Sequence, residues 1–195
     1  MTRFRFLMPL CLVAGLVSLA CTATQNTAAP ETSEMPSEVT GDPKIQNALS
    51  AAPAGIATDA AVMDFPATPG GPMVELRAGT NGWTCLPDMA DTPANDPMCM
   101  DKNAMQWADA WMSKKSPALS GTGIGYMLQG GATADNDDPF AKTPKPGKNW
   151  IMEPPHLMVF GSKLDPTVHS NQPNTTQPWV MWKGTPYEHL MVPVK

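Results

Sequence analysis

The sequence predicts an α+β fold: a single small domain with a mostly antiparallel sheet of about six short strands, two helical segments and long loops. Predicted strands lie on both sides of one clear helix, without a repeated strand-helix alternation, and this favours antiparallel pairing. The tetrapeptide HLMV also occurs twice, at 156–159 and 189–192, each time shortly after a Trp-x-Met segment. We interpret the two copies as similar strands around which the rest of the chain packs.

The first 20 residues predict a signal peptide. Arg3 and Arg5 precede an apolar run of 14 residues, 7–20, which is shorter than a transmembrane helix normally requires and fits a cleaved signal peptide. The stretch VSLAC, ending at Cys21, resembles a bacterial lipobox, although Ser18 stands where that pattern prefers Leu. Cleavage before Cys21 would leave a lipid-modified cysteine that anchors the chain to a membrane. Ordinary cleavage nearby, which would release a soluble protein, is the alternative.

Residues 21–41 predict a flexible tether, and residues 42–195 the globular domain. The tether is rich in Thr, Ser, Ala, Pro and Glu, and such a run buries too little apolar surface to offset its ordering entropy. Without the two arginines of the signal, the chain has 11 basic and 18 acidic side chains, a net charge of −7. It has no basic stripe, so nucleic acid is not an expected partner.

Turn residues and apolar spacing place the elements of the first half of the domain. Asp42 and Pro43 start a helix whose apolar spacing continues to Ala52, with a second short turn through Ile56. Alternating or apolar runs predict strands at 61–65 and 73–77, followed by an Asn-Gly turn at 79–82 and an extended piece from residue 83.

The second half begins with two cysteines that we expect to form a disulfide. In an exported domain Cys85 and Cys99 would close a loop of roughly 15 residues, worth about 3 kcal/mol in the chain-entropy model. Asp101 can cap a helix that ends near Lys114. Strands are expected at 123–128, 156–160, 179–182 and 189–194. The loops 86–98, 130–148 and 162–178 exceed the usual connection length, so they are either functional or closely packed.

Several stretches resemble a family of uncharacterised exported bacterial proteins. They are PAGIATDAAVMDFP, GTNGWTCLPD, NDPMCMD, GYMLQGG, PPHLMV and GTPYEHLMVPV, and together they cover roughly residues 43–195. The resemblance implies export and one domain, and it supplies no catalytic residue.

The repeated tetrapeptide supplies the first candidate site. Residues two apart on a strand share a face, so His156 would project with Met158, and His189 with Met191. If the strands are neighbours in register, two imidazoles and two thioethers converge, a soft ligand set suited to copper, especially Cu(I). The alternative is that the methionines fill gaps in the core and each histidine is hydrogen-bonded at the sheet edge.

Carboxylates near the histidines allow two further hypotheses. Zinc could be held by His156, His189 and either Glu153 or Glu188, although no spacing is diagnostic. The same histidines with one of these carboxylates could serve as an acid-base pair in a small exported enzyme.

The acidic loops are candidate calcium sites. Asp135, Asp137 and Asp138 follow a Gly-Gly pair, but they lack the full twelve-residue calcium-loop pattern. A second acidic cluster in the disulfide loop comprises Asp88, Asp91 and Asp96. Turn formation beside proline explains both clusters without a metal.

From these observations we expect an exported protein of the bacterial envelope, periplasmic or at the outer surface, anchored through Cys21. The favoured function is binding of a small ligand or an envelope protein. The alternatives are a small exported enzyme and a periplasmic copper-binding protein.

Overall fold

The computed structural model describes residues 41–195 except Pro69, Pro166 and Lys195. The predicted signal peptide, the lipidation residue Cys21 and the tether to residue 40 therefore lie outside the described residues. The described part belongs to one compact unit. Within it, no helix has the length and apolar character needed to cross a membrane.

The described residues form three helices: α1 (Pro43–Leu49), α2 (Ala54–Ala57) and α3 (Lys102–Met112). The predicted caps of α1 and α3 are confirmed. The Asp42 carboxylate accepts from the Lys44 N–H at 2.7 Å, and the Asp101 carboxylate accepts from the Ala104 N–H at 2.8 Å. The other oxygen of Asp101 accepts from the N–H of Ile124, so one side chain both starts α3 and holds it against the sheet.

In the described part of the chain, eight strands form one sheet and two short strands form a second, so the expectation of about six strands was wrong. The main sheet contains β1 (Ala61–Asp64), β2 (Val74–Arg77), β3 (Thr84–Leu86), β4 (Met98–Met100), β5 (Gly123–Met127), β8 (His156–Phe160), β9 (Trp179–Met181) and β10 (His189–Pro193). Their order is β2-β1-β3-β4-β5-β8-β10-β9. Among the strands of the described residues, β1 and β3 alone pair in parallel, so the α+β class and the mostly antiparallel pairing are confirmed in a sheet that is mixed. Strands β6 (Gly131–Thr133) and β7 (Ile151–Glu153) pair separately.

Three strands, β4, β6 and β7, are absent from the sequence-based expectation, and two of them lie at the ends of predicted loops. Strand β4 ends the loop 86–98, and β6 begins the loop 130–148. Each is three residues long, which is too short to show a period of two. Their pairing comes from tertiary contacts: β4 lies between β3 and β5, and β6 pairs with β7 across the whole intervening loop.

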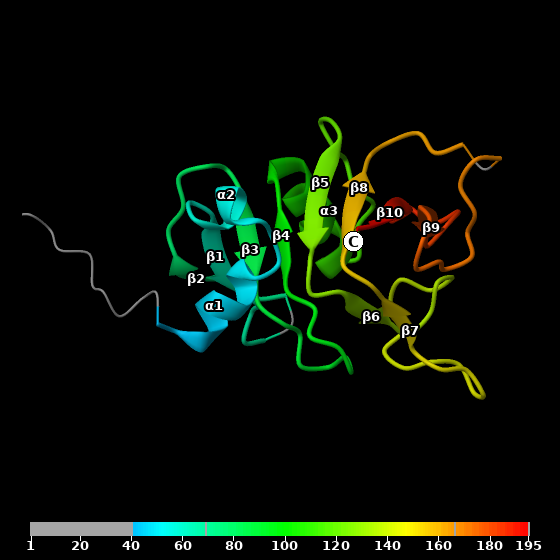
Figure 1. Ribbon diagram of the computed structural model, residues 1–195, viewed down its shortest axis with the longest axis horizontal. Coiled ribbons are helices and arrows are strands. Elements are labelled where there is room, and N and C mark those ends of the chain that lie inside the picture. Colours follow the sequence, from blue (N-terminus) through cyan, green and yellow to red (C-terminus); the bar gives the residue numbers. More distant parts are fainter. Residues whose placement is uncertain (1–40, 69, 166, 195) are drawn as a thin grey trace, which may run out of the picture. The chain divides into compact units, whose positions relative to one another are not determined.

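The two faces of the main sheet carry different cores. In Figure 1, α1 and α2 lie in front of β1 and β3, whereas α3 lies behind β5. On the α1 side, a cluster contains Ile45, Val62 and both cysteines of the disulfide. On the α3 side, a larger cluster contains Trp107, Phe160 and the buried methionines. Because side chains alternate along each strand, neighbouring residues supply opposite faces.

The predicted disulfide is present and lies on the α1 side. Cys85 and Cys99 are direct partners in the antiparallel β3–β4 pair, with their Cα atoms 3.9 Å apart. On the α3 side, the helix approaches β5 so closely that a Cβ added at Gly123 would lie 2.5 Å from the backbone nitrogen of Ala104. The absence of a side chain at Gly123 therefore allows α3 to contact the sheet.

Candidate functional site

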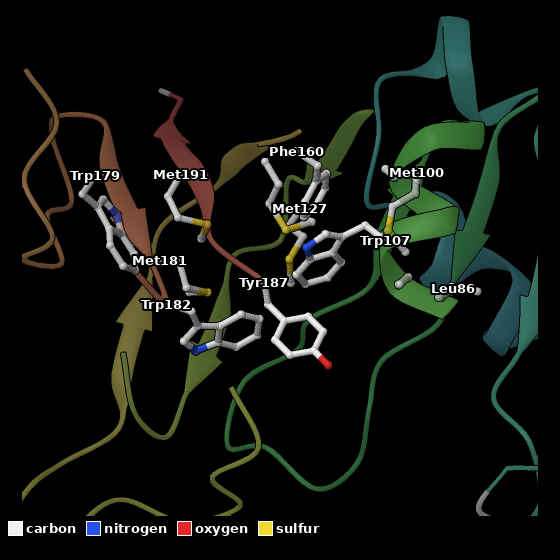
Figure 2. Close-up of a cluster of buried hydrophobic side chains, with 13 residues drawn as sticks. Leu86, Met100, Trp107, Met127, Phe160, Trp179, Met181, Trp182, Tyr187 and Met191 are labelled. Carbon is white, nitrogen blue, oxygen red and sulfur yellow. The ribbon is translucent and has the colours of Figure 1, made fainter. Parts of the chain in front are cut away.

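A pocket of about 490 Å³ lies between the α3-side face of the sheet and α3 itself. Its lining contains eight of the twelve methionines found in residues 41–195. Figure 2 shows the side chain of Trp107 reaching from α3 toward Met181 and Met191 on the strands. Unbranched thioethers adapt to irregular shapes, so this lining suits an apolar occupant without demanding one rigid shape.

Four tryptophans line the pocket, and three of them form one group. The rings of Trp107, Trp111 and Trp182 lie nearly parallel, with centroids 6.0 to 6.3 Å apart. The indole N–H of Trp111 donates to the Pro139 carbonyl and that of Trp182 to the Asp135 carbonyl. The buried indole N–H of Trp107 has no hydrogen-bond partner among the described residues.

His189 is a buried histidine in this pocket, with one ring nitrogen unpartnered. It is 2% exposed, and its ring lies about 5 Å from those of Trp107, Phe160 and Trp182. Nδ1 lies 2.9 Å from the Tyr187 carbonyl oxygen, which can only accept, so Nδ1 carries the proton. Nε2 is then an acceptor, and it finds no partner in the described part of the chain. Burial lowers the pKa of His189 to about 4, with a smaller contribution from the charge of His156, so the imidazole is neutral near pH 7.

The two HLMV copies are neighbouring antiparallel strands, but their register pairs the methionines and not the histidines. Met158 lies directly opposite Met191, whereas His156 lies opposite Pro193. Four residues separate Pro193 from His189, which places the two histidines about 13 Å apart along the strands. His156 is also buried on the α3 side, and its Nδ1 lies 2.7 Å from the Pro154 carbonyl oxygen. Both histidines therefore face the same way, and Nδ1 of each is held by the backbone carbonyl of the residue two positions before it.

Two carboxyl groups, Glu153 and Asp96, lie at another part of the pocket wall. Gly131 is opposite Glu153 in the β6–β7 pair, and a Cβ added there would lie 2.9 Å from Glu153 Oε2 and 3.6 Å from Asp96 Cβ. Gly131 thus leaves room for both side chains. Glu153 Oε1 is inaccessible and unpartnered within the described residues.

The environment of both carboxyls favours their protonated forms. Burial is the main cause of the rise in the pKa of Glu153 to about 7, and the charge of Asp96 adds to it. Burial likewise raises the pKa of Asp96 to about 6, despite a 2.6 Å hydrogen bond from the Thr92 hydroxyl. Groups whose pKa is shifted in this way are enriched at functional sites.

Glu188, the other carboxylate proposed for zinc or catalysis, lies away from the pocket lining. Its Oε2 accepts from the Gly184 N–H at 2.8 Å, so it stabilises the turn before β10. Across the described part of the chain, no three His, Cys, Asp or Glu side chains are grouped so as to hold a metal.

The acidic loops are held by internal contacts. The carboxylate of Asp135 lies 2.7 Å from Lys145 Nζ, and that of Asp137 lies 3.4 Å from the same ammonium group. Asp138 accepts from the Phe140 N–H and thereby forms a turn. In the disulfide loop, Asp88 accepts from the Asp96 N–H. Calcium binding at these loops stays a prediction.

Comparison of the chain with family models, with curated proteins and with solved structures gave no match. Sequence reasoning had named His189, Met158, Met191 and Glu153 as candidates, but it had missed the pocket role of Asp96, Trp107 and Met181. The available signals were the high number of methionines and the two carboxylates close to proline, neither of which specifies a location.

Proposed function

We propose that this domain binds a small, largely apolar ligand in the pocket between the sheet and α3. The observation that carries the proposal is the pocket itself: about 490 Å³, with a lining rich in methionine and aromatic side chains and mostly apolar. Ligand sites commonly have volumes of roughly 300 to 1,000 Å³ and this type of lining. Binding is favoured over catalysis because no hydrogen bond joins His189 to either pocket carboxyl among the described residues.

The proposal includes the location of the protein. We infer an exported protein of the bacterial envelope, anchored through a lipid on Cys21 and belonging to the exported family that its motifs resemble. The basic start, the apolar run and the VSLAC sequence support this inference. Membrane fractionation tests it: a Cys21→Ala variant that remained membrane-bound would refute lipidation at this residue.

Filling the pocket should abolish binding. Ala108 lies on α3, is 4% exposed and lines the pocket, so the ring of an Ala108→Phe variant would occupy the ligand space. We expect wild-type protein to increase the fluorescence of the neutral apolar dye N-phenyl-1-naphthylamine, and the variant to bind it at least about tenfold more weakly.

Ala110→Phe is the matched control, because Ala110 lies on the same helix outside the pocket lining and should leave dye binding unchanged. Circular dichroism would confirm that both variants fold. Equal dye binding by wild type and Ala108→Phe would contradict the proposed location, and no binding by wild type would contradict the proposed function.

A copper(I) site is the second candidate function, and it would use only one of the two histidines. Met181 lies directly opposite His189 in the β9–β10 pair, and Met191 lies two residues further along on the same face. The Nδ1–H of His189 is fixed by a backbone carbonyl, the usual arrangement when the other ring nitrogen binds a metal. One neutral imidazole with two thioethers is a suitable set for Cu(I).

Competition with a chromogenic Cu(I) chelator tests this candidate. The wild-type protein should take up one Cu(I), and a Met181→Leu/Met191→Leu double variant should bind it at least about tenfold more weakly. Met152→Leu is the control, because that side chain is 55% exposed. Absence of competition by the wild type would exclude this function, as would equal affinity of all three proteins.

A further inference from the structure

The pocket presents more hydrogen-bond acceptors than donors. Its buried polar atoms without a hydrogen-bond partner among residues 41–194 that the structure describes are Glu153 Oε1, His189 Nε2 and the indole N–H of Trp107. Nε2 is an acceptor because Nδ1 carries the proton, and Glu153 accepts through both oxygens once it is ionised. Buried polar groups in proteins are normally satisfied, so these atoms indicate what a bound ligand must supply.

The Glu153–Asp96 pair also has no basic partner. The ion pairs of the described residues are Lys44 with Asp64, and Lys145 with Asp135 and Asp137. Two lysines line the pocket, but both are exposed, and Lys114 Nζ lies over the Phe140 ring at 5.2 Å from its centroid. A positive charge that matches the two carboxyls is therefore absent from the described part of the protein.

The rest of the lining is also favourable to a cation. The faces of tryptophan rings carry negative potential, and four such rings belong to the wall. The lining contains four acidic side chains, Asp91, Asp96, Asp138 and Glu153, against two lysines. An anionic ligand would meet repulsion, and a ligand without a donor would leave Glu153 Oε1 unsatisfied.

We propose that the ligand is an organic cation, with an apolar body against the methionines and tryptophans and an ammonium group on the Glu153–Asp96 pair. The proposal rests on the proposed function and names the ligand class for the same pocket. The fit is electrostatic as well as steric: the ammonium hydrogens satisfy Glu153 Oε1, and the alkyl or aryl part fills the apolar volume.

Binding is coupled to proton release. Without ligand, the two carboxyls are protonated below about pH 6 to 7. The other charged or titratable groups near them are Asp88, which hydrogen-bonds to the Asp96 backbone, and His189, Asp91, Asp138, Lys114 and Lys142 of the pocket lining. An ammonium ligand must displace a proton from the pair, so its affinity rises with pH through this range.

A matched pair of ligands tests the proposal: octylamine and 1-octanol, each displacing N-phenyl-1-naphthylamine from the wild-type protein. Octylamine is cationic at both pH 5 and pH 8. We expect it to bind at least about tenfold more tightly than octanol at pH 8, the effect of a hydrogen bond to a charged group. At pH 5 its affinity should fall at least about tenfold, while that of octanol stays unchanged.

Variants test whether the preference for octylamine over octanol comes from the Glu153 carboxyl. Glu153→Gln should remove the preference for the amine and leave octanol binding intact, whereas Glu188→Gln, outside the pocket, should behave as wild type. Equal affinities of the two ligands at pH 8, or a preference that survives in Glu153→Gln, would overturn the cation proposal and leave pocket binding in place. Failure of the dye to bind wild-type protein would overturn the proposed function itself.

Discussion

The Glu153→Gln variant should be more stable than wild type at pH 8, by up to about 3 kcal/mol in the free energy of unfolding, and equal to it at pH 4.5. The reason is the rise of the Glu153 pKa from 4.5 to about 7 on burial. For an acid whose pKa is raised in the fold, the associated stability is fully present below the unfolded pKa and is lost as the pH rises through the folded one. Glutamine has nearly the same shape and stays neutral, so it avoids this loss.

Urea denaturation at pH 4.5, 6 and 8, without ligand, measures this difference. Glu75→Gln is the matched control, because Glu75 is exposed on β2 and its replacement should change little at any of the three pH values. A Glu153→Gln variant that was less stable than wild type at pH 8 would show that the carboxylate has a partner that compensates its charge.

Each variant must be compared with wild type at the same pH, because the titration of other groups also changes the free energy of unfolding. Burial raises the pKa of Asp96 to about 6. The stability that the protonated Asp96 contributes is therefore lost as the pH rises, over a range similar to that of Glu153. His189 has the opposite sign: its pKa is lowered to about 4, so its contribution is present above pH 6.5 and is lost as the pH falls toward 4.

Replacing Phe160 by alanine should lower the free energy of unfolding by about 4 kcal/mol. Phe160 is fully buried on the α3 side of β8, with its ring centroid 4.5 Å from that of Trp107 and 4.9 Å from that of His189. The substitution removes this packing and leaves a cavity beside the pocket.

The neighbouring residue gives the control for Phe160. Val159 precedes it on β8, points to the opposite face and is only partly buried, so Val159→Ala should cost about 1 kcal/mol. Chemical denaturation of both variants gives the comparison. Similar losses at the two positions would contradict the assignment of the two faces of β8.

The sequence predicted elements well where a pattern extends over several residues. The HLMV copies predicted two similar strands, which the structure places side by side, and Asp101 predicted the start of α3. The cysteine count, together with the expectation of export, predicted the disulfide. Three-residue strands such as β4 and β6 have no readable period, so their existence depends on partners that are distant in sequence.

The candidate site was less predictable because its parts come from separate elements. Glu153 follows Met152, an exposed residue, and nothing in their local sequence shows that the carboxyl is covered. Its environment depends on Gly131, opposite it on β6, and on Asp96 from the disulfide loop. The expectation that both histidines converge depended on register, and the antiparallel register brings Met158 and Met191 together instead.

The order of the strands also bears on how fast the pocket can assemble. Strand β8 pairs with β5 on one side and with β10 on the other, and each pairing joins segments separated by about thirty residues. Closing such loops costs chain entropy before the contacts form, so this half of the sheet should fold more slowly than the β3–β4 pair. The part of the pocket wall that holds Met158, Met191 and His189 thus depends on pairings between segments distant in sequence, whereas Met181 is placed by the local β9–β10 pair.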